Sequence, residues 1–215
     1  MTSTAVNLHA RARAGRNKRA ATRGRLIEVA LKLCARRSPD ALTIDDIVDS
    51  AGLARGTFYN YFRTVQELSQ AAFDHALTTL GERVAADLAA LPAPVADDPL
   101  TRLAALLRSF LHWATREPDL GWVVVRVSAS ALPTGTLPVQ QLIRRGLRNG
   151  SFSVPSEPLA VELLTSSLVA AARATLSGRR GVRELDQATE LMLQTVGAPP
   201  AAARRAVAVL SSKRT

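Results

Sequence analysis

The chain has 215 residues, which is enough for one large domain or two modest ones. Hydrophobic residues make up 47% of it, so a core can be buried and a disordered or fibrous protein is excluded. The net charge of +10 comes from the two ends, because residues 1–25 hold seven basic side chains, residues 200–215 hold four, and neither segment holds an acidic one. A basic N-terminal segment attracts phosphate, although a solvated tail is the commoner role of a basic terminus.

The sequence lacks three features that would place the protein in a membrane or outside the cell. No run of about 18 consecutive apolar residues is present, which argues against a membrane span. No apolar segment follows the basic N-terminus, as it would in a secretory signal. Cys34 is the only cysteine, so an internal disulfide is excluded, and this fits the reducing cytoplasm. We therefore expect a cytoplasmic protein.

The first helix is predicted to begin near Thr22, after a basic disordered arm at residues 1–21 that lacks apolar periodicity. Apolar residues then recur at three- and four-residue spacing, which places them on one stripe of a helix. They are Leu26, Ile27, Ala30, Leu33 and Cys34. Pro39 is expected to end this helix.

Two short helices are predicted to follow. Thr43 stands three residues before Asp46, as in a capping box, and begins a helix that reaches Ala51. Gly52 can take the positive φ that ends a helix, and a second helix is expected at residues 54–62. Two helices joined by a tight turn have the spacing of a helix-turn-helix, whose second helix enters the major groove of DNA.

The second short helix can separate a core face from a DNA face. Phe58 and Phe62 are four residues apart, so they share a face and can anchor the helix. The residues left to point outward are Arg55, Thr57, Tyr59 and Asn60. Arginine prefers guanine and asparagine prefers adenine, whereas hydroxyl groups suit phosphate oxygens. Gly56 removes a side chain where the helix approaches the duplex.

The rest of the chain is predicted to be helical. Thr64 and Glu67 form a second capping pattern, which opens a long helix that reaches about Leu91, and a proline-rich linker follows at residues 92–99. Further helices are expected at residues 99–116, 119–131, 135–149, 157–178, 182–196 and 200–212. A strand at residues 123–127 is the alternative there, because β-branched residues are enriched, although the helical surroundings favour a helix.

A longer pattern surrounds the two short helices. It consists of Thr43-Ile44-Asp45-Asp46-Ile47, of Ala51-Gly52-Leu53-Ala54-Arg55-Gly56-Thr57-Phe58-Tyr59-Asn60-Tyr61-Phe62, and of Glu67-Leu68. This pattern resembles the DNA-binding domain of the tetracycline-repressor (TetR) family, over about residues 22–70. The resemblance implies an all-α transcription regulator with an N-terminal helix-turn-helix domain at residues 22–68 and a helical effector-binding and dimerisation domain at residues 69–215. It also implies a homodimer that binds a palindromic operator in double-stranded DNA and that a small molecule releases.

The resemblance further implies roles for single residues. Thr43 would contact a phosphate at the start of its helix, and Tyr59 and Tyr61 would hold the DNA backbone. Base contacts would come from Arg55, Gly56, Thr57 and Asn60. The chain departs from the family at Ala54, where Ser or Thr is frequent, and at Val65, where Lys is frequent. Arg63 and the basic arm could replace the lost phosphate contact.

A dimer interface is expected on the late helices. One short reading helix gives few base contacts, and a two-fold dimer doubles them. The helices at residues 157–178 and 182–196 carry more apolar surface than one stripe needs, so two from each subunit can form a four-helix interface. The expected interface residues are Leu164, Leu168, Ala171, Leu185 and Met192. The alternative is that these residues only close the core of the subunit.

An effector pocket is expected among the middle helices. Phe110, Trp113 and Trp122 gather around Pro118 in the sequence, and pockets for small molecules are mostly apolar with a few polar groups. The polar groups would be Arg126 and His112. Ordinary core packing is the alternative for each aromatic residue.

The sequence gives no basis for catalysis, for a metal site or for a cofactor. It lacks Gly-x-Ser-x-Gly, Gly-x-x-x-x-Gly-Lys and His-Glu-x-x-His, and its three histidines are scattered. Cys34 lies on the apolar stripe of the first helix, which favours an inert core thiol. Two other functions remain open: a nucleoid-type DNA binder without an effector, and an enzyme that carries a helix-turn-helix.

Overall fold

A computed structural model of the chain describes residues 3–127, 138–179 and 181–211. The chain divides into two compact units, an N-terminal unit of Met1–His75 and a C-terminal unit of Ala76–Thr215. The boundary falls within α4 (Val65–Ala89), so one continuous helix belongs to both units. Every regular element among the described residues is a helix, which confirms the predicted all-α fold.

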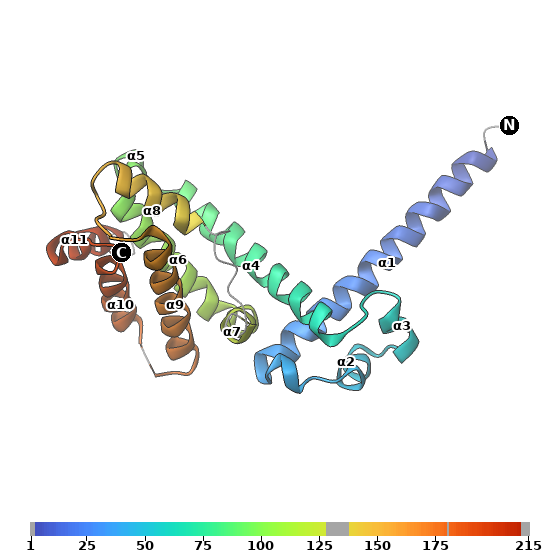
Figure 1. The fold of residues 1–215 in the computed structure, drawn as a ribbon. Coiled ribbons are helices and arrows are strands. Elements are labelled where there is room, and N and C mark those ends of the chain that lie inside the picture. Colours follow the sequence, from blue (N-terminus) through green and yellow to red (C-terminus); the bar gives the residue numbers. More distant parts are fainter. Residues whose placement is uncertain (1–2, 128–137, 180, 212–215) are drawn as a thin grey trace. The chain divides into compact units, whose positions relative to one another are not determined.

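The N-terminal unit begins with α1 (Ser3–Arg36), which is longer than predicted (Figure 1). Its C-terminal part carries the predicted apolar stripe, with Leu26, Ala30 and Cys34 buried. The expectation of disorder at residues 1–21 is wrong from Ser3 onward, because these residues continue the same helix. Alanine and arginine are strong helix formers and no proline interrupts the segment, so a helix nucleated at its packed end extends toward the N-terminus.

The predicted helix-turn-helix is confirmed. A 3-10 turn, η1 (Pro39–Ala41), leads to α2 (Ile44–Ala51), which packs against α1 and is followed by α3 (Arg55–Tyr59). Gly52 caps α2 with φ of 59°, a conformation that other residues rarely adopt. The third helix is shorter than predicted, since residues 60–62 leave the helix in a turn.

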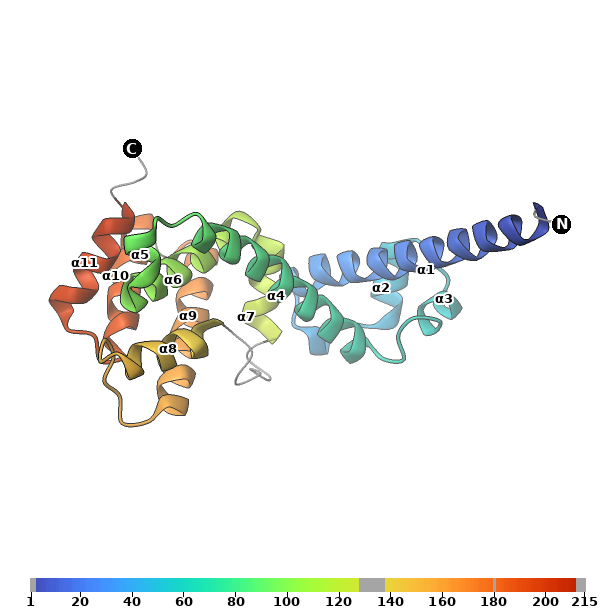
Figure 2. The ribbon, with the colours of Figure 1, turned by 90° about the horizontal axis from the view of Figure 1, so that it is seen from above.

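The C-terminal unit is a helical bundle built around one central helix (Figure 2). Besides the end of α4, its elements are α5 (Ala93–Asp97), α6 (Pro99–Arg116), α7 (Pro118–Val127), α8 (Pro138–Arg148), α9 (Glu157–Leu176), α10 (Val182–Gln194) and α11 (Pro200–Ser211). The central helix is α6, which contacts α5 and every helix from α7 to α11. Its fully buried residues, among them Leu103, Leu107 and Leu111, form the middle of the core.

Most of the predicted helices of this unit are confirmed. The predicted linker contains the short helix α5, which begins directly after Pro92. Residues 123–127 belong to α7, so a strand there is wrong. Residues 128–131 of one predicted helix and 135–137 of the next lie outside the described residues.

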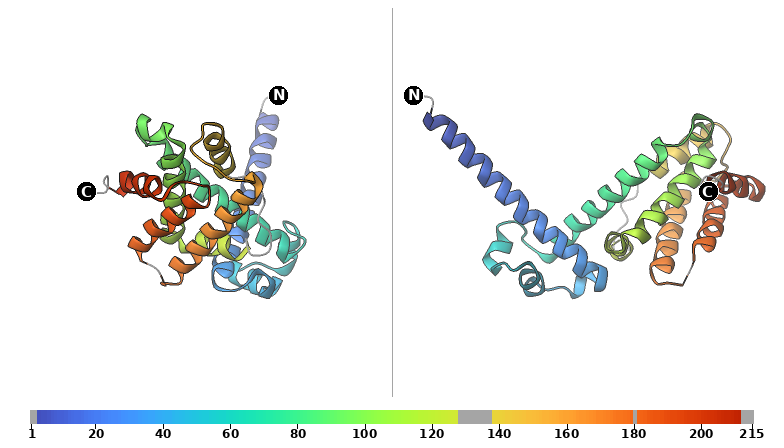
Figure 3. Two further views of the ribbon diagram at one scale, coloured as in Figure 1. Left: turned by 60° about the vertical axis from the view of Figure 1, so that its left-hand side comes forward. Right: turned by 180° about the vertical axis from the view of Figure 1, so that it is seen from behind.

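Among the described residues, α9 alone is long and apolar enough to cross a membrane by length and composition. The core helix of a soluble protein meets the same criterion. In this unit α9 packs against α6, α7, α8 and α10, and it lies beside α10 over its length (Figure 3).

Candidate nucleic-acid interface

Two phenylalanines fix the orientation of α3. Phe58 and Phe62 are 0% and 2% exposed, and their ring centroids lie 6.2 Å apart. Because they are four residues apart, they hold one side of this segment in the core of the N-terminal unit. Their predicted role as anchors is confirmed.

The opposite side of α3 faces solvent. Arg55, Gly56 and Asn60 are exposed, Thr57 is half-buried, and Tyr59 is 51% exposed. These are side chains that can contact base edges and phosphate oxygens, and the helix presents them away from its own core.

Thr43 caps α2 through the predicted capping box. Its Oγ1 accepts a hydrogen bond of 3.1 Å from the backbone N–H of Asp46, and Oδ2 of Asp46 accepts one of 3.0 Å from the N–H of Thr43. The hydrogen bonds from Thr43, with a smaller contribution from the charge of Arg37, lower the pKa of the Asp46 carboxyl. The start of α2 is therefore capped by its own side chains, and helix N-termini carry backbone N–H groups of the kind that bind phosphate.

Arg55 is paired with Asp45 of α2 on the protein surface. Its Nη1 lies 2.9 Å from Oδ1 and 3.1 Å from Oδ2 of that carboxylate. Both side chains are more than half exposed, and an exposed ion pair of this kind contributes little to stability. Arg55 can therefore leave Asp45 for an acceptor on DNA at a low cost in free energy.

Two further predicted DNA contacts follow α3. Tyr61 is partly buried, and the guanidinium carbon of Arg19 lies 5.7 Å from the centre of its ring. The Arg63 side chain is 93% exposed, and its Nε lies 3.9 Å from Oε2 of Glu67. Both side chains lie at the end of the helix-turn-helix, where the chain turns toward α4.

The sequence predicted a phosphate-binding basic arm, but it did not place the arginines of this arm on α1 beside the end of α3. Arg19 donates a hydrogen bond of 3.3 Å from Nη2 to the backbone oxygen of Asn60. The guanidinium carbon of Arg23 lies 5.2 Å from the centre of the Phe62 ring. The spacing of Arg16, Arg19 and Arg23 by three and four residues is a helical signal, which the expectation of a disordered arm concealed.

The candidate effector residues lie in two places in the C-terminal unit. The guanidinium carbon of Arg126 lies 4.9 Å from the centre of the Trp122 ring, on α7. Nε of Arg126 is buried and has no hydrogen-bond partner among the described residues. Trp113 donates a hydrogen bond of 2.9 Å to Asp87 of α4, whereas Phe110 and Trp122 are partly buried against the core.

The expected dimer residues lie mainly inside the subunit. Leucine and alanine side chains of α9 and a methionine of α10 belong to the core, and one leucine of α10 is partly buried against it. They are Leu164, Leu168, Ala171, Met192 and Leu185. The large exposed apolar residues of the same helices are Leu159, Leu163 and Leu191. Periodicity identifies apolar stripes, but it does not say which stripe the subunit uses for its own core.

Family comparisons cover both units. The family model of "bacterial regulatory proteins, tetR family" matches residues 26–72. A second family model, "Tetracyclin repressor-like, C-terminal domain", matches residues 98–209, which is more than half of the chain. No curated protein sequence matches the chain.

Solved structures share the arrangement of helices. RolR without ligand is 27% identical with a TM-score of 0.60, and the match covers 86% of this chain and 96% of RolR. RolR in complex with its ligand resorcinol is 26% identical with a TM-score of 0.61, and the match covers 93% and 96%. A TetR family transcription regulator from Marinobacter aquaeolei VT8 is 16% identical with a TM-score of 0.66 over 84% of this chain and 98% of that chain, which is a likeness of fold alone.

Proposed function

Because the chain belongs to the tetracycline-repressor (TetR) family of DNA-binding transcription regulators, we propose that it represses transcription by binding a palindromic operator as a homodimer. A small molecule that binds the C-terminal unit would release it from DNA. The observation that carries this proposal is the two-sided α3, with Phe58 and Phe62 in the core and a polar face in solvent.

The polar face of α3 suits base readout in the major groove. Arg55 would contact guanine and Asn60 would contact adenine, because these side chains match the acceptor and donor groups of those bases. Gly56 and Thr57 lie between them and allow a close approach. Phosphate contacts from Thr43, Tyr59, Tyr61 and Arg63 would set the position of the helix in the groove.

The dimer would form through an exposed apolar face of α9 and α10. Leu159 and Leu163 are 50% and 49% exposed and lie four residues apart on α9, while Leu191 of the adjacent α10 is 64% exposed. Leucines this exposed on two neighbouring helices can pack against the same face of a second copy in a two-fold four-helix arrangement. The same face explains the apolar character of α9 in a protein that we place in the cytoplasm.

The effector would bind the C-terminal unit near α7. The buried Nε of Arg126 beside the Trp122 ring offers a hydrogen-bond donor next to an aromatic surface, which suits a small aromatic molecule with oxygen substituents. Phe110 and Trp113 are the other candidate residues. A molecule that binds one conformation of this unit better than another shifts the population of DNA-binding chains by that difference in affinity.

Selection of duplexes from a random pool by the purified chain tests the operator proposal. We expect a two-fold symmetric sequence with half-sites about one helical turn apart. Asn60→Ala should relax the preference at one base pair in each half-site, at a cost of about 1–3 kcal/mol. Recovery of duplexes without a shared sequence would contradict the proposal and favour a nucleoid-type DNA binder.

Resorcinol, the ligand named for RolR, is a defined probe for the effector proposal. Added to the complex with the selected duplex, it should weaken DNA binding of the wild-type chain, and Trp122→Ala should reduce that response more than it changes DNA affinity. An equal response in the two proteins would remove Trp122 from the site. No response in the wild-type chain would exclude resorcinol as an effector.

A further inference from the structure

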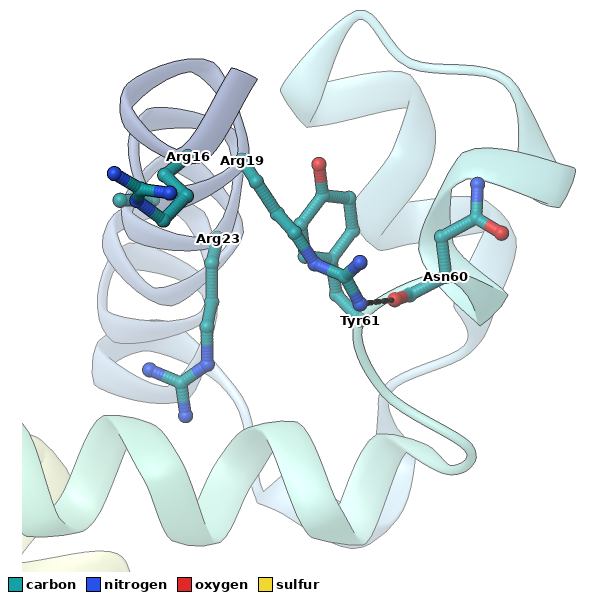
Figure 4. Close-up of a pocket in the computed structure, with 6 residues that line it drawn as sticks. Arg16, Arg19, Arg23, Asn60 and Tyr61 are labelled. Carbon is teal, nitrogen blue, oxygen red and sulfur yellow. Dashed lines mark hydrogen bonds between the residues drawn. The ribbon is translucent and has the colours of Figure 1, made fainter. Parts of the chain in front are cut away.

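An open pocket lies between α1 and the end of α3 in the N-terminal unit (Figure 4). Its volume is about 350 Å³, and it is lined by Arg16, Arg19, Ala20, Arg23, Asn60 and Tyr61. Figure 4 shows the Arg19 side chain crossing from α1 to the backbone of Asn60. Asn60 is also a residue of the reading face, so the pocket directly adjoins the proposed DNA contacts.

The pocket carries a concentrated positive charge. Arg16, Arg19 and Arg23 lie on one face of α1, because they are spaced by three and four residues. None of the three forms an ion pair with a carboxylate in the part of the chain that the structure describes. Among the described residues Lys18 and Arg25 of α1 also form none, so the pocket is distinguished by three such arginines lying together. The pocket therefore has cationic donors that no neighbouring acid neutralises.

Two contacts hold part of this cluster in place before any ligand binds. The hydrogen bond of Arg19 to the backbone oxygen of Asn60 uses only one of the five guanidinium N–H groups, which leaves the others for an acceptor. Arg23 stacks beside Phe62, whose ring is itself buried. Preorganised arginines are the usual ligands of phosphate, because their planar donor groups match its oxygens.

We propose that this pocket binds a phosphate of the DNA backbone, so that α1 is a second DNA-contacting element beside α3. The inference rests on the proposed DNA-binding function and extends it to a site outside the helix-turn-helix. A small-molecule site would be enclosed and largely apolar, whereas this pocket is open to solvent and lies next to a base-reading residue. A backbone phosphate at the flank of the half-site can reach an open pocket and would lie next to the bases that Asn60 contacts. It would replace the contact that Val65 cannot make at the start of α4.

The salt dependence of duplex binding measures this contact. Each phosphate contact contributes a slope of about −0.9 to a plot of log affinity against log salt concentration. We expect Arg16→Gln with Arg19→Gln to reduce the steepness of that slope by about 1, and to weaken binding about tenfold near 0.1 M salt. The loss should be the same on the selected operator and on an unrelated duplex, because phosphate contacts carry no sequence information.

Lys18→Gln with Arg25→Gln is the matched control. This double variant removes the same amount of charge from the same helix. Lys18 and Arg25 are seven residues apart and lie on the side of α1 opposite Arg16. We expect it to change the slope by much less than the pocket variant. Equal changes in the two variants would mean a general effect of net charge, and no change in either would mean that α1 stays away from DNA; both results overturn the proposal.

Three further measurements distinguish the ways in which the proposal could fail. Circular dichroism and thermal unfolding show whether each variant folds. If the double variant does not fold, Arg16→Gln alone replaces it in the test, because Arg16 forms no hydrogen bond or ion pair among the described residues. If the wild-type chain binds all duplexes equally and the pocket variant still reduces the salt-dependence slope, the operator proposal is refuted and the proposal for the pocket stands. Calorimetry with inorganic phosphate that detects binding lost in the pocket variant, together with unchanged DNA affinity, assigns the pocket to a free anion and overturns the DNA contact.

Discussion

Nε1 of Trp113 donates a hydrogen bond of 2.9 Å to Oδ2 of Asp87, which joins α6 to the part of α4 that belongs to the C-terminal unit. The hydroxyl of Ser109, which is buried, donates to the same carboxylate oxygen. The guanidinium carbon of Arg83 lies 4.7 Å from the centre of the Trp113 ring, and Nε of Arg83 pairs with Glu117 at 2.5 Å. The Asp87 carboxylate thus links α4 to two residues of α6, one of which is the candidate effector residue Trp113.

Replacement of Asp87 by alanine should destabilise the C-terminal unit. It leaves the buried Ser109 hydroxyl and the Trp113 N–H without their acceptor, and an unpaired buried donor costs about 1–3 kcal/mol. Urea unfolding followed by tryptophan fluorescence measures the free energy of unfolding, and Asp87→Asn, which keeps an acceptor oxygen, should lose less. Equal stability of the alanine variant and the wild-type chain would show that water replaces the carboxylate.

Asp45→Asn should strengthen DNA binding. The change removes a negative charge beside the proposed DNA face and releases Arg55 from its ion pair, so the arginine no longer has to leave a carboxylate on binding. We expect a several-fold gain in operator affinity, measured by fluorescence anisotropy at fixed salt. Asp49→Asn, an exposed acid on the same helix, has the same charge change without the contact to Arg55 and is the control. An equal gain in both variants would attribute the effect to net charge alone.

Local signals account for the part of the fold that the sequence predicts well. The capping box at Thr43, the positive φ of Gly52 and the two phenylalanines of α3 act over three or four residues, so their spacing is sufficient to place them. The polar face of α3 follows from the same spacing, which is why the candidate DNA residues could be named from the sequence.

Long-range packing decides what the sequence left unresolved. The choice between a core stripe and an exposed stripe on α9 and α10 depends on which helices surround them, and that information lies in the distant helix α6. The first part of α1 has no apolar stripe and therefore gives no helical periodicity, although its alanine and arginine content favours a helix that the packed end nucleates. Arg19 meets Asn60 across 41 residues of sequence, a contact that no local pattern contains.

The stability of the capping box should depend on pH at the acidic end. Hydrogen bonds from Thr43 lower the pKa of Asp46 in the folded chain, so the charged carboxylate favours the folded state. This contribution is complete above the ordinary pKa of an aspartate and is lost as the pH falls through the lowered folded value. Asp46→Asn should therefore show a weaker loss of unfolding free energy at acidic pH than the wild-type chain. Direct titration of the Asp46 carboxyl by NMR checks the direction, and a value at or above that of an unfolded aspartate would contradict it.

A charge on the exposed face of α9 should separate the dimer. Leu163 is 49% exposed, so Leu163→Arg adds a charge without opening the subunit core, and two such charges would meet across a two-fold interface. Light scattering should give the mass of one chain, with little change in the melting temperature extrapolated to low concentration. Operator affinity should fall at least tenfold, since a single reading helix makes half of the base contacts.

The matched control for that variant is Val209→Arg on α11, where the replaced side chain is 41% exposed and also apolar. It should keep the mass of two chains, because α11 is not part of the proposed face. If both variants stay dimeric, the exposed leucines of α9 and α10 serve another purpose and the two chains meet elsewhere. If both become monomeric, the interface extends to α11, and the area that stabilises the dimer is larger than the leucines of α9 and α10 alone.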